Sequence, residues 1–343
     1  MSAPVFAPGF LAVAGVYGQF LAVAYRVKPV SLDAEGRVND WRFDIWSHNH
    51  GERPKPSKTY SNLLAASQIE KAWPRPPQKP GDGKEASEHR NAWPAYDFEG
   101  PRIAKHFVPD PAFRCSSLRG LGAFCNVFAI ESMMDELARE GGQDAVAFRL
   151  AHLHDPRARA VIEEAARRIG WNPQAWGDGR GQGLAYARYK NMAAYCAVAI
   201  ELTIDRNSGV IRLERVAAAT DVGEAVSPDG VVNQIEGGIV QATSWTLKER
   251  VRFSPAEVTS RDWVTYPILT FAEAPPAMET TVLDRPGEPF LGVGEASQGP
   301  TPAAIANAVE NAIGVRLREL PFTSERVRAM LAAASRIQPP TSS

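Results

Sequence analysis

Cysteine is scarce in this sequence of 343 residues, and its spacing does not suit a cross-linked or metal-binding framework. Only Cys115, Cys125 and Cys196 occur, and no two of them form a Cys-x-x-Cys pair. This pattern argues against a disulfide scaffold and against a zinc or iron–sulfur site built within the chain. We expect small buried thiols and a reducing compartment, most simply the cytoplasm. The alternative is a periplasmic location, or one at a membrane through a partner.

An excess of one sign of charge is also lacking. The formal net charge is −1, and Lys and Arg are scattered along the chain. We therefore expect neither nucleic acid nor an anionic membrane surface as a partner. Residues 3–25 carry no charge and could span a bilayer, but prolines and glycines interrupt them and no basic segment precedes them. Two buried strands around a glycine turn are the favoured interpretation, and a membrane segment is the alternative.

What the sequence does contain is the composition of a globular protein long enough for two domains. Hydrophobic residues make up 44% and charged residues 22% of the chain. Residues 13–30 and 37–47 are predicted to be strands joined by a turn at 33–36. Residues 51–97 are rich in proline and predict irregular chain, with at most one short helix near 60–71. Such a long loop is usually functional, mobile or held by a partner.

Regular patterns resume near residue 103 and mix helices with strands. Apolar spacing and capping residues predict helices at 126–139, 144–153, 155–170, 227–246 and 301–313. Residues 196–204 and 210–219 flank the turn-forming segment 205–209, which predicts a β-hairpin. Because the strands do not alternate regularly with the helices, the fold class is predicted to be α+β.

Three glycine-containing segments stand out as candidate sites. In the first, Glu295 follows Gly292, Val293 and Gly294, and a helix of small residues with free amides at its N-terminus comes next. In the second, a Gly-Gly pair at 237–238 interrupts a predicted helix. Two such glycines disfavour a helix, so either tight helix packing or a ligand must come close to this face. The third, residues 119–122, places an arginine beside bare backbone.

Taken in order, these segments resemble the xanthine dehydrogenase/aldehyde oxidase family of molybdenum hydroxylases. The likeness is to the large subunit of the isoquinoline 1-oxidoreductase and membrane-associated aldehyde dehydrogenase branch. It covers residues 98–331 strongly and the first 50 residues loosely. The segments that carry it are Arg119–Gly122 with the helix after it, Phe148–Leu150, Asp155–Arg157, Gly170-Trp171, Asp221–Gly223, Gln234–Gly238 and Gly292–Glu295.

This resemblance implies a molybdopterin cofactor-binding domain of the aldehyde oxidase/xanthine dehydrogenase type. The implied reaction hydroxylates an aldehyde or N-heteroaromatic carbon with oxygen from water. Glu295 is then the general base, and Arg119 is a catalytic cation that orients the substrate or stabilises negative charge. The implied cofactor is molybdenum–molybdopterin, with the cytosine dinucleotide form as one variant, and no residue of this chain is expected to ligate the metal. Residues assigned to cofactor binding are Gly120, Leu121, Gly122, Gln234, Gly237, Gly238, Gly292, Val293 and Gly294.

The chain also departs from the family pattern. The Met-Gly-Gln-Gly and Gly-Gly-x-Phe-Gly segments with which the family grips the pterin and metal do not occur, nor does a [2Fe–2S] cysteine pattern. We expect the chain to begin just after the second of these loops. Residues 1–110 would then be the tail of a first molybdopterin-binding domain, including the irregular loop 51–97, and residues 111–343 the second domain, with the catalytic Glu.

These departures imply partners. A complete enzyme would need a chain supplying the missing molybdopterin-binding loops and a small subunit whose [2Fe–2S] clusters accept the electrons. The alternative is a non-catalytic partial or truncated subunit with an assembly role. The histidine pairs at 48 and 50 and at 152 and 154 lack a third metal ligand at a suitable spacing. We expect those histidines to be solvated or to lie on helix faces.

Overall fold

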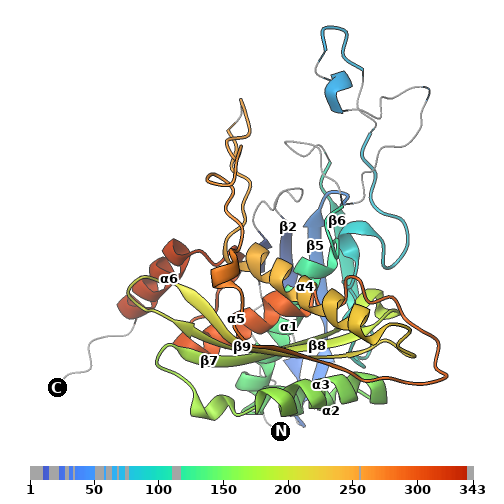
Figure 1. Cartoon of the computed structure of the whole chain (residues 1–343), viewed down its shortest axis with the longest axis vertical. Coiled ribbons are helices and arrows are strands. Elements are labelled where there is room, and N and C mark those ends of the chain that lie inside the picture. The colour runs from blue at the N-terminus through green and yellow to red at the C-terminus, as the bar shows by residue number, and fades with distance from the viewer. Residues whose placement is uncertain are drawn as a thin grey trace.

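Two β-sheets, with helices between and against them, form the fold (Figure 1). The computed structural model describes residues 11–14, 23–27, 31–33, 35–50, 58, 64–67, 69–73, 77–109, 117–254 and 256–337. Among these residues, no helix combines the length and the apolar character needed to cross a bilayer.

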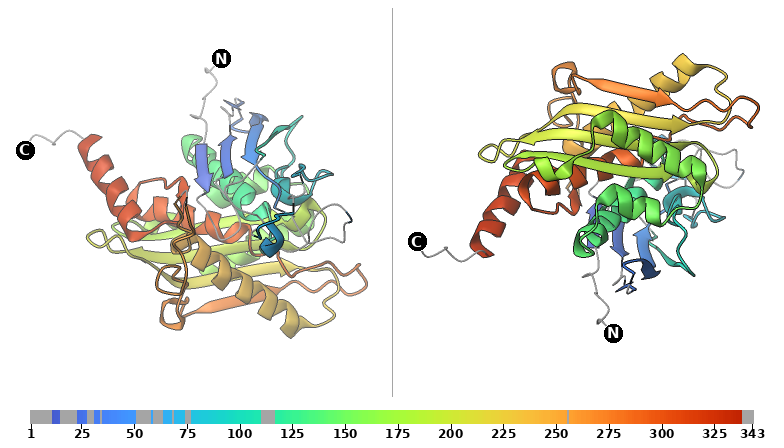
Figure 2. Two further views of the ribbon diagram at one scale, coloured as in Figure 1. Left: turned by 90° about the horizontal axis from the view of Figure 1, so that it is seen from above. Right: turned by 90° about the horizontal axis from the view of Figure 1, so that it is seen from below.

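The four-stranded sheet has the order β10-β9-β8-β7. Its strands are β7 (Arg180–Arg188), β8 (Tyr195–Ile204), β9 (Ile211–Asp221) and β10 (Met278–Val282). β7, β8 and β9 are antiparallel neighbours, and β10 runs parallel to β9. Nearly every side chain of β8 is buried, because helices cover both faces of this sheet. α3 (Pro156–Ile169) packs along β8 and β9 on one face, and α5 (Pro300–Ile313) packs along β7 and β8 on the other (Figure 2).

The five-stranded sheet has the order β11-β1-β2-β5-β6 and joins the two ends of the chain. Its strands are β1 (Leu11–Ala14), β2 (Val23–Val27), β5 (Arg42–Ser47), β6 (Arg102–Phe107) and β11 (Glu319–Leu320). β1 pairs with β11 in parallel, in the register Val13↔Glu319. One hydrophobic core runs from Leu32 to Val327. The division into domains at residue 110 therefore stays a proposal, and the two parts share their core.

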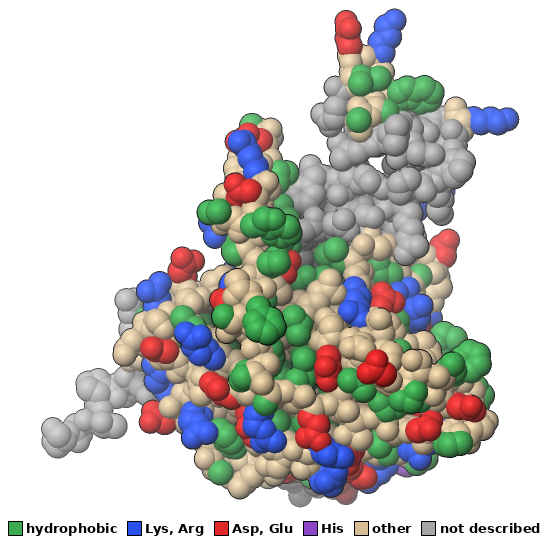
Figure 3. Space-filling view, in the orientation of Figure 1, with side chains coloured by type: hydrophobic (Ala, Val, Ile, Leu, Met, Phe, Trp, Pro, Cys, Tyr) green, Lys and Arg blue, Asp and Glu red, His purple; other side chains and the backbone are tan. Residues whose placement is uncertain are grey.

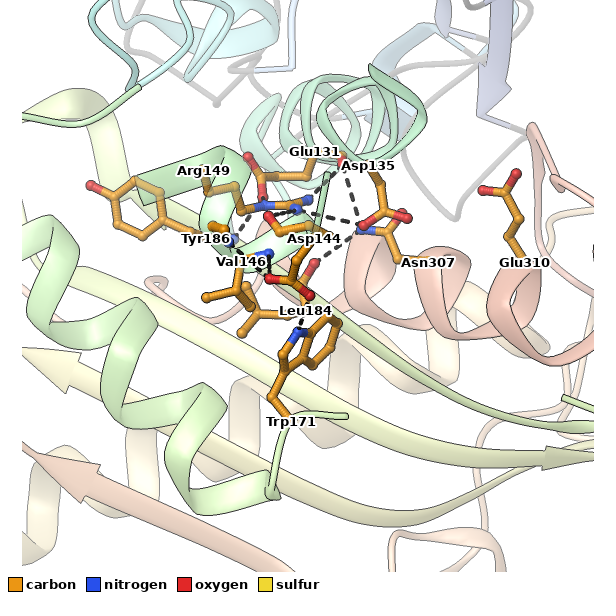
Figure 4. Close-up of polar contacts among 12 residues, drawn as sticks. Glu131, Asp135, Asp144, Val146, Arg149, Trp171, Leu184, Tyr186, Asn307 and Glu310 are labelled. Carbon is orange, nitrogen blue, oxygen red and sulfur yellow. Dashed lines mark hydrogen bonds and ion pairs between the residues drawn. The ribbon is translucent and has the colours of Figure 1, made fainter. Parts of the chain in front are cut away.

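α1 (Ala123–Glu140) is buried on nearly all sides and packs against α5, β2 and β7. Its buried carboxylate Glu131 and the partly buried Asp135 form an ionic cluster with Arg149 of α2 (Ala145–Ala151), close to α5 (Figure 4). Arg149 is 0% exposed and donates from Nε to Oε2 of Glu131 at 2.9 Å. The backbone amide of Tyr186 donates to the same carboxylate oxygen at 2.9 Å. These bonds fix the angle between α1, α2 and β7, which sets the position of the N-terminus of α1.

The remaining elements lie at the periphery. α4 (Pro228–Leu247) crosses β9 and β10 beside α5, and α6 (Ser324–Ile337) follows β11. β3 (Ser31–Leu32) and β4 (Val38–Asp40) form a small hairpin. Short 3-10 helices occupy Leu64–Ser67 (η1), Ser87–His89 (η2), Pro173–Ala175 (η3), Tyr189–Asn191 (η4) and Phe271–Glu273 (η5).

The α+β class and most predicted elements are confirmed. The Asp155-Pro156 start and Gly170 end match α3, and the hairpin at 205–209 joins β8 to β9. Among residues 3–25, those described form β1 and part of the antiparallel β2, whereas the proposed turn between them lies outside the described residues. Strands β3, β6, β7, β10 and β11 and helix α6 were not predicted. β7 contains two glycines, which weaken the local preference for a strand, and its strand conformation depends on pairing with β8.

Candidate active site at the Glu295 loop

Four segments that are distant in sequence meet around Glu295. Glu295 lies in the turn that follows β10 and leads into α5, and residues 119–122 lie just before α1. Gln234 lies in the first half of α4, and η4 begins with Tyr189 at the end of β7. The packing of α1 and α4 on α5, and of α5 on β7, brings these four segments together.

Both carboxylate oxygens of Glu295 accept a hydrogen bond. The backbone amide of Gly120 donates to Oε1 at 2.8 Å, and the Tyr189 hydroxyl donates to Oε2 at 2.5 Å. The glutamate is partly exposed, whereas Tyr189 and Gly120 are buried. The carboxylate is therefore held in one orientation while part of it still faces solvent, as a base that must reach a substrate requires.

The conformation of Gly120 is what directs its amide toward Glu295. Its φ is +88°, in the region that residues with a Cβ rarely adopt, and Leu121 follows with φ +50°. A Cβ at Gly120 would also lie 3.0 and 3.1 Å from side-chain carbons of Gln298. Glycine at this position is required for both reasons.

Arg119 fastens the Glu295 loop to α4. Its Nε donates to the carbonyl of Gly294 at 2.5 Å, and its Nη2 donates to the carbonyl and to Oε1 of Gln234 at 2.9 and 3.0 Å. Partial burial lowers the pKa of Arg119, and the nearby Glu295 charge opposes that effect. The predicted proximity of Arg119 to Glu295 and Gln234 is thus found, and its catalytic role remains a prediction.

The two adjacent glycines in the middle of α4 have different surroundings. Gly238 is buried, and a Cβ there would lie 2.2 Å from Oγ of Ser297, which donates to the carbonyl of Ile235 at 2.8 Å. Tight packing within the chain therefore accounts for the close approach at this position. Gly237 is exposed, and the nearest atom to its Cβ position is Nη1 of Arg119 at 3.9 Å. Only Gly237 leaves its face of the helix open to a ligand.

The residues assigned to cofactor binding divide into a buried and an exposed group. The amide of Gly120 is bonded to Glu295 and that of Gly122 to the carbonyl of Ser87 at 3.1 Å, so these two position the loop. The exposed group forms a strip of bare backbone beside the Gln234 amide, with no other atom within 4 Å of the Cβ position at Gly292. The carbonyls of Gly292 and Gly294 already accept hydrogen bonds within the chain, so the strip offers chiefly a surface without side chains against which a flat group could lie. Its members are Gln234, Gly237, Gly292 and Gly294, with Val293 half-buried between the last two.

Backbone strain is concentrated around the same site. Among the described residues, six that are not glycine have positive φ, and five of these lie in the segments around Glu295 or in segment 85–91, which contacts them: Ser87, Asn91, Leu121, Lys190 and Asn191. Asn91 ties two segments together, because its Nδ2 donates to the carbonyl of Arg188 at 2.8 Å and its Oδ1 accepts from the amide of Lys190 at 2.9 Å. Strain of this kind persists only where the surrounding structure imposes it, and it clusters at functional sites.

Segment 85–91 and Tyr189 were missed by sequence reasoning. They lie in what reads as irregular chain and at the end of an unpredicted strand, so no local motif marks them.

The expectation for the histidines was wrong in part. His48, His50 and His152 are buried, and only His154 is exposed. His50 is buried because η2 packs over it, and its amide donates to Oγ of Ser87 at 2.8 Å.

Comparisons with known proteins identify the domain to which part of this site belongs. Residues 118–275 match the family model of the molybdopterin cofactor-binding domain, a range that includes Arg119 and α4 and ends before Glu295. The chain is 44% identical over 256 residues to a nicotinate dehydrogenase subunit from Pseudomonas putida, covering 71% of this chain and 21% of that protein. It is 34% identical over 231 residues to the beta subunit of isoquinoline 1-oxidoreductase from Brevundimonas diminuta, covering 66% and 29%. The chain thus spans less than a third of either relative.

Solved structures share the fold. Quinoline 2-oxidoreductase from Pseudomonas putida 86 superposes with a TM-score of 0.71 at 13% identity, covering 93% of this chain and 62% of that one. CO dehydrogenase from Oligotropha carboxidovorans superposes with a TM-score of 0.69 at 10% identity, covering 92% and 62%. At these identities the likeness shows the fold.

Proposed function

The chain belongs to the xanthine dehydrogenase family through its molybdopterin cofactor-binding domain, and from that membership we propose that it forms part of the active site of a molybdenum hydroxylase with Glu295 as the general base. The observation that carries the proposal is the position of the Glu295 carboxylate. It is fixed at both oxygens and lies next to the exposed strip of Gln234, Gly237, Gly292 and Gly294.

The residues of this chain have separate proposed roles in the reaction. The strip and the Gln234 amide would bind the pterin through backbone groups and one side chain. Glu295 would accept the proton released as oxygen derived from water bonds to the substrate carbon. Arg119 keeps its positive charge near this carboxylate while it holds the loop to α4. The molybdenum cofactor, when bound, supplies the activation of water and the two-electron acceptor.

The substrate is proposed to be a small aldehyde or N-heteroaromatic compound. The names of the two curated relatives refer to nicotinate and isoquinoline, both nitrogen heterocycles, which supports the heteroaromatic branch. The electrons would then pass to [2Fe–2S] clusters on a partner chain.

An exposed apolar arm supports association with further polypeptide. Residues 250–254 and 256–275, which follow α4 and precede β10 in the chain, project from the body, and Figure 3 shows hydrophobic side chains along this arm. Trp263, Val264 and Phe271 are 74%, 86% and 99% exposed. Large apolar side chains gathered in this way usually mark an interaction surface. We assign this surface to polypeptide that carries the two molybdopterin-binding segments absent from these 343 residues.

Co-expression tests the proposal. The chain should be produced with neighbouring gene products that carry the Met-Gly-Gln-Gly and Gly-Gly-x-Phe-Gly segments and the iron–sulfur cysteines, and the purified material analysed for molybdenum and pterin. We expect a complex containing both, and we expect the chain purified alone to contain neither. A complex without molybdenum, or tight pterin binding by the chain alone, would contradict the proposal.

A further inference from the structure

We propose that Tyr189, oriented by Arg90, is the positioning residue that holds the Glu295 carboxylate in its working orientation. The inference rests on the proposed role of Glu295 as the base, and it adds two residues that neither the sequence motifs nor the matched domain range identified for that role.

The direction of each hydrogen bond follows from the chemistry of the donors. Nη1 of Arg90 lies 2.6 Å from the hydroxyl oxygen of Tyr189, and that oxygen lies 2.5 Å from Oε2 of Glu295. A guanidinium can only donate, so Arg90 occupies a lone pair of the phenol oxygen. The hydroxyl hydrogen must therefore point to Glu295. Arg90 thus determines that Tyr189 acts as a donor to the carboxylate.

The surroundings hold this pair in place. Tyr189 is 5% exposed, and its amide donates to the carbonyl of Ala194 at 2.9 Å across a turn with positive φ at Lys190 and Asn191. Nε of Arg90 donates to the carbonyl of Glu85 at 3.1 Å. The strained turn positions the Tyr189 phenol, and segment 85–91 positions the Arg90 guanidinium. Together they place both groups in a chain of hydrogen bonds that ends at Glu295.

The same geometry argues against Tyr189 as a proton relay. Burial and the hydrogen bond to Glu295 raise its pKa well above the usual value, so the phenol stays protonated. A relay would have to pass the hydroxyl proton onward, and its other neighbour, Arg90, cannot accept one. The remaining charged groups near the carboxylate are Arg119 and the Arg90 and Lys190 cations, which lie over the phenol ring at 5.5 and 5.4 Å from its centre. A donor at Oε2 favours the charged form of the carboxylate.

Nuclear magnetic resonance of the full chain tests the contact without any cofactor. Tyrosine is labelled with ¹³C at Cζ, and the Tyr189 signal is identified by its loss in Tyr189→Phe or, if that variant does not fold, by its change in Arg90→Met. We expect the signal to move in one acid transition that Glu295→Gln abolishes. Tyr195 is the matched control, because its hydroxyl donates to Oδ2 of Asp155 at 2.7 Å and its response should persist in Glu295→Gln.

Kinetics of the assembled, cofactor-loaded enzyme test the role. Tyr189→Phe should lower kcat by about tenfold to a hundredfold, leave KM within about twofold, and move the acid limb of the kcat/KM profile to higher pH. Arg90→Met should also lower kcat and move the acid limb to higher pH, by smaller amounts than Tyr189→Phe. Tyr195→Phe should leave kcat and the acid limb unchanged.

Two results would overturn the proposal. One is a Tyr189 signal whose acid transition is absent, or is the same in Glu295→Gln. The other is a folded Tyr189→Phe enzyme with unchanged kcat and an unmoved acid limb. Activity retained by Glu295→Gln would instead refute the proposed base, and the resonance result would still decide whether Tyr189 holds that carboxylate.

Discussion

The backbone amide of Gly120 donates a hydrogen bond of 2.8 Å to Oε1 of Glu295, across a sequence separation of 175 residues. Gly120 lies just before α1, and Glu295 lies in the turn that leads into α5. Because α1 and α5 pack directly against each other, the geometry of the carboxylate depends on the core as well as on its own loop.

Gly120→Ala should therefore impair turnover and stability together. An alanine at φ +88° carries strain of about 1–3 kcal/mol, and its Cβ would press on Gln298 and displace the amide from Glu295. The free energy of unfolding and kcat/KM of the assembled enzyme are the quantities to measure. Gly142→Ala is the control, because Gly142 also has positive φ but nothing lies within 4 Å of its Cβ position. It should lose stability and keep turnover, and equal losses of turnover in both variants would refute the explanation.

The two neighbouring glycines of α4 should respond in opposite ways to alanine. Gly238→Ala should lower the free energy of unfolding by about 1–3 kcal/mol, because its Cβ would meet Oγ of Ser297. Adding Ser297→Ala should restore part of the loss. Gly237→Ala should raise the free energy of unfolding by up to about 1 kcal/mol, since the position is exposed and alanine favours a helix. If Gly237 contacts the pterin, the same variant should retain less cofactor in the complex.

Arg149→Met should be among the most destabilising substitutions in the chain. Removing the guanidinium leaves the Glu131 carboxylate buried without its partner, which costs about 3–5 kcal/mol. Urea unfolding measures the loss. Arg167→Met is the matched control, because Arg167 also pairs with a glutamate, Glu164, but is exposed. Its unfolding midpoint should barely move. A similar unfolding midpoint for the two variants would show that burial does not determine how much an ion pair contributes to stability.

Stability should fall on acidification below pH 6.5, and His50 should contribute to the fall. Burial is the main cause that lowers the pKa of His50 from 6.5 to about 3. Between these values the unfolded chain binds a proton that the folded chain does not, so His50 destabilises the fold by about 1.4 kcal/mol per pH unit as pH drops. His48 and His152, whose pKa values burial also lowers, act in the same direction. Urea unfolding between pH 7.5 and 5 should show a shallower slope in His50→Gln than in the wild type; equal slopes would contradict the assignment.

The sequence predicts the bounds of helices and strands better than it predicts which residues contact one another in the folded chain. The α3 boundaries follow from Asp155, Pro156 and Gly170, because capping is a local interaction. The family resemblance carried by the glycine motifs implied that Arg119, Gln234 and Glu295 belong to one site. Local chemistry alone predicted the helix boundaries and did not predict that grouping.

The roles of Tyr189 and Arg90 could not be predicted from the sequence, because they depend on contacts between distant residues. Arg90 and Tyr189 are 99 positions apart, and Tyr189 and Glu295 are 106 positions apart. Tyr189 follows a strand whose conformation comes from pairing with β8, and Arg90 lies in chain that reads as irregular. The burial of His50 has the same origin, since η2 covers it from 37 residues away. Long-range packing of this kind leaves no local signature.

The central claim is that Glu295 is the base of a molybdopterin-dependent site, and the Glu295→Gln variant of the co-purified complex tests it most directly. Glutamine keeps the shape of the side chain, but its single carbonyl oxygen can accept from only one of Gly120 and Tyr189, and it cannot take up the proton. Molybdenum and pterin content and the steady-state rate are measured on one preparation. We predict cofactor content equal to that of the wild type with turnover abolished, and turnover retained at the wild-type rate would contradict the claim.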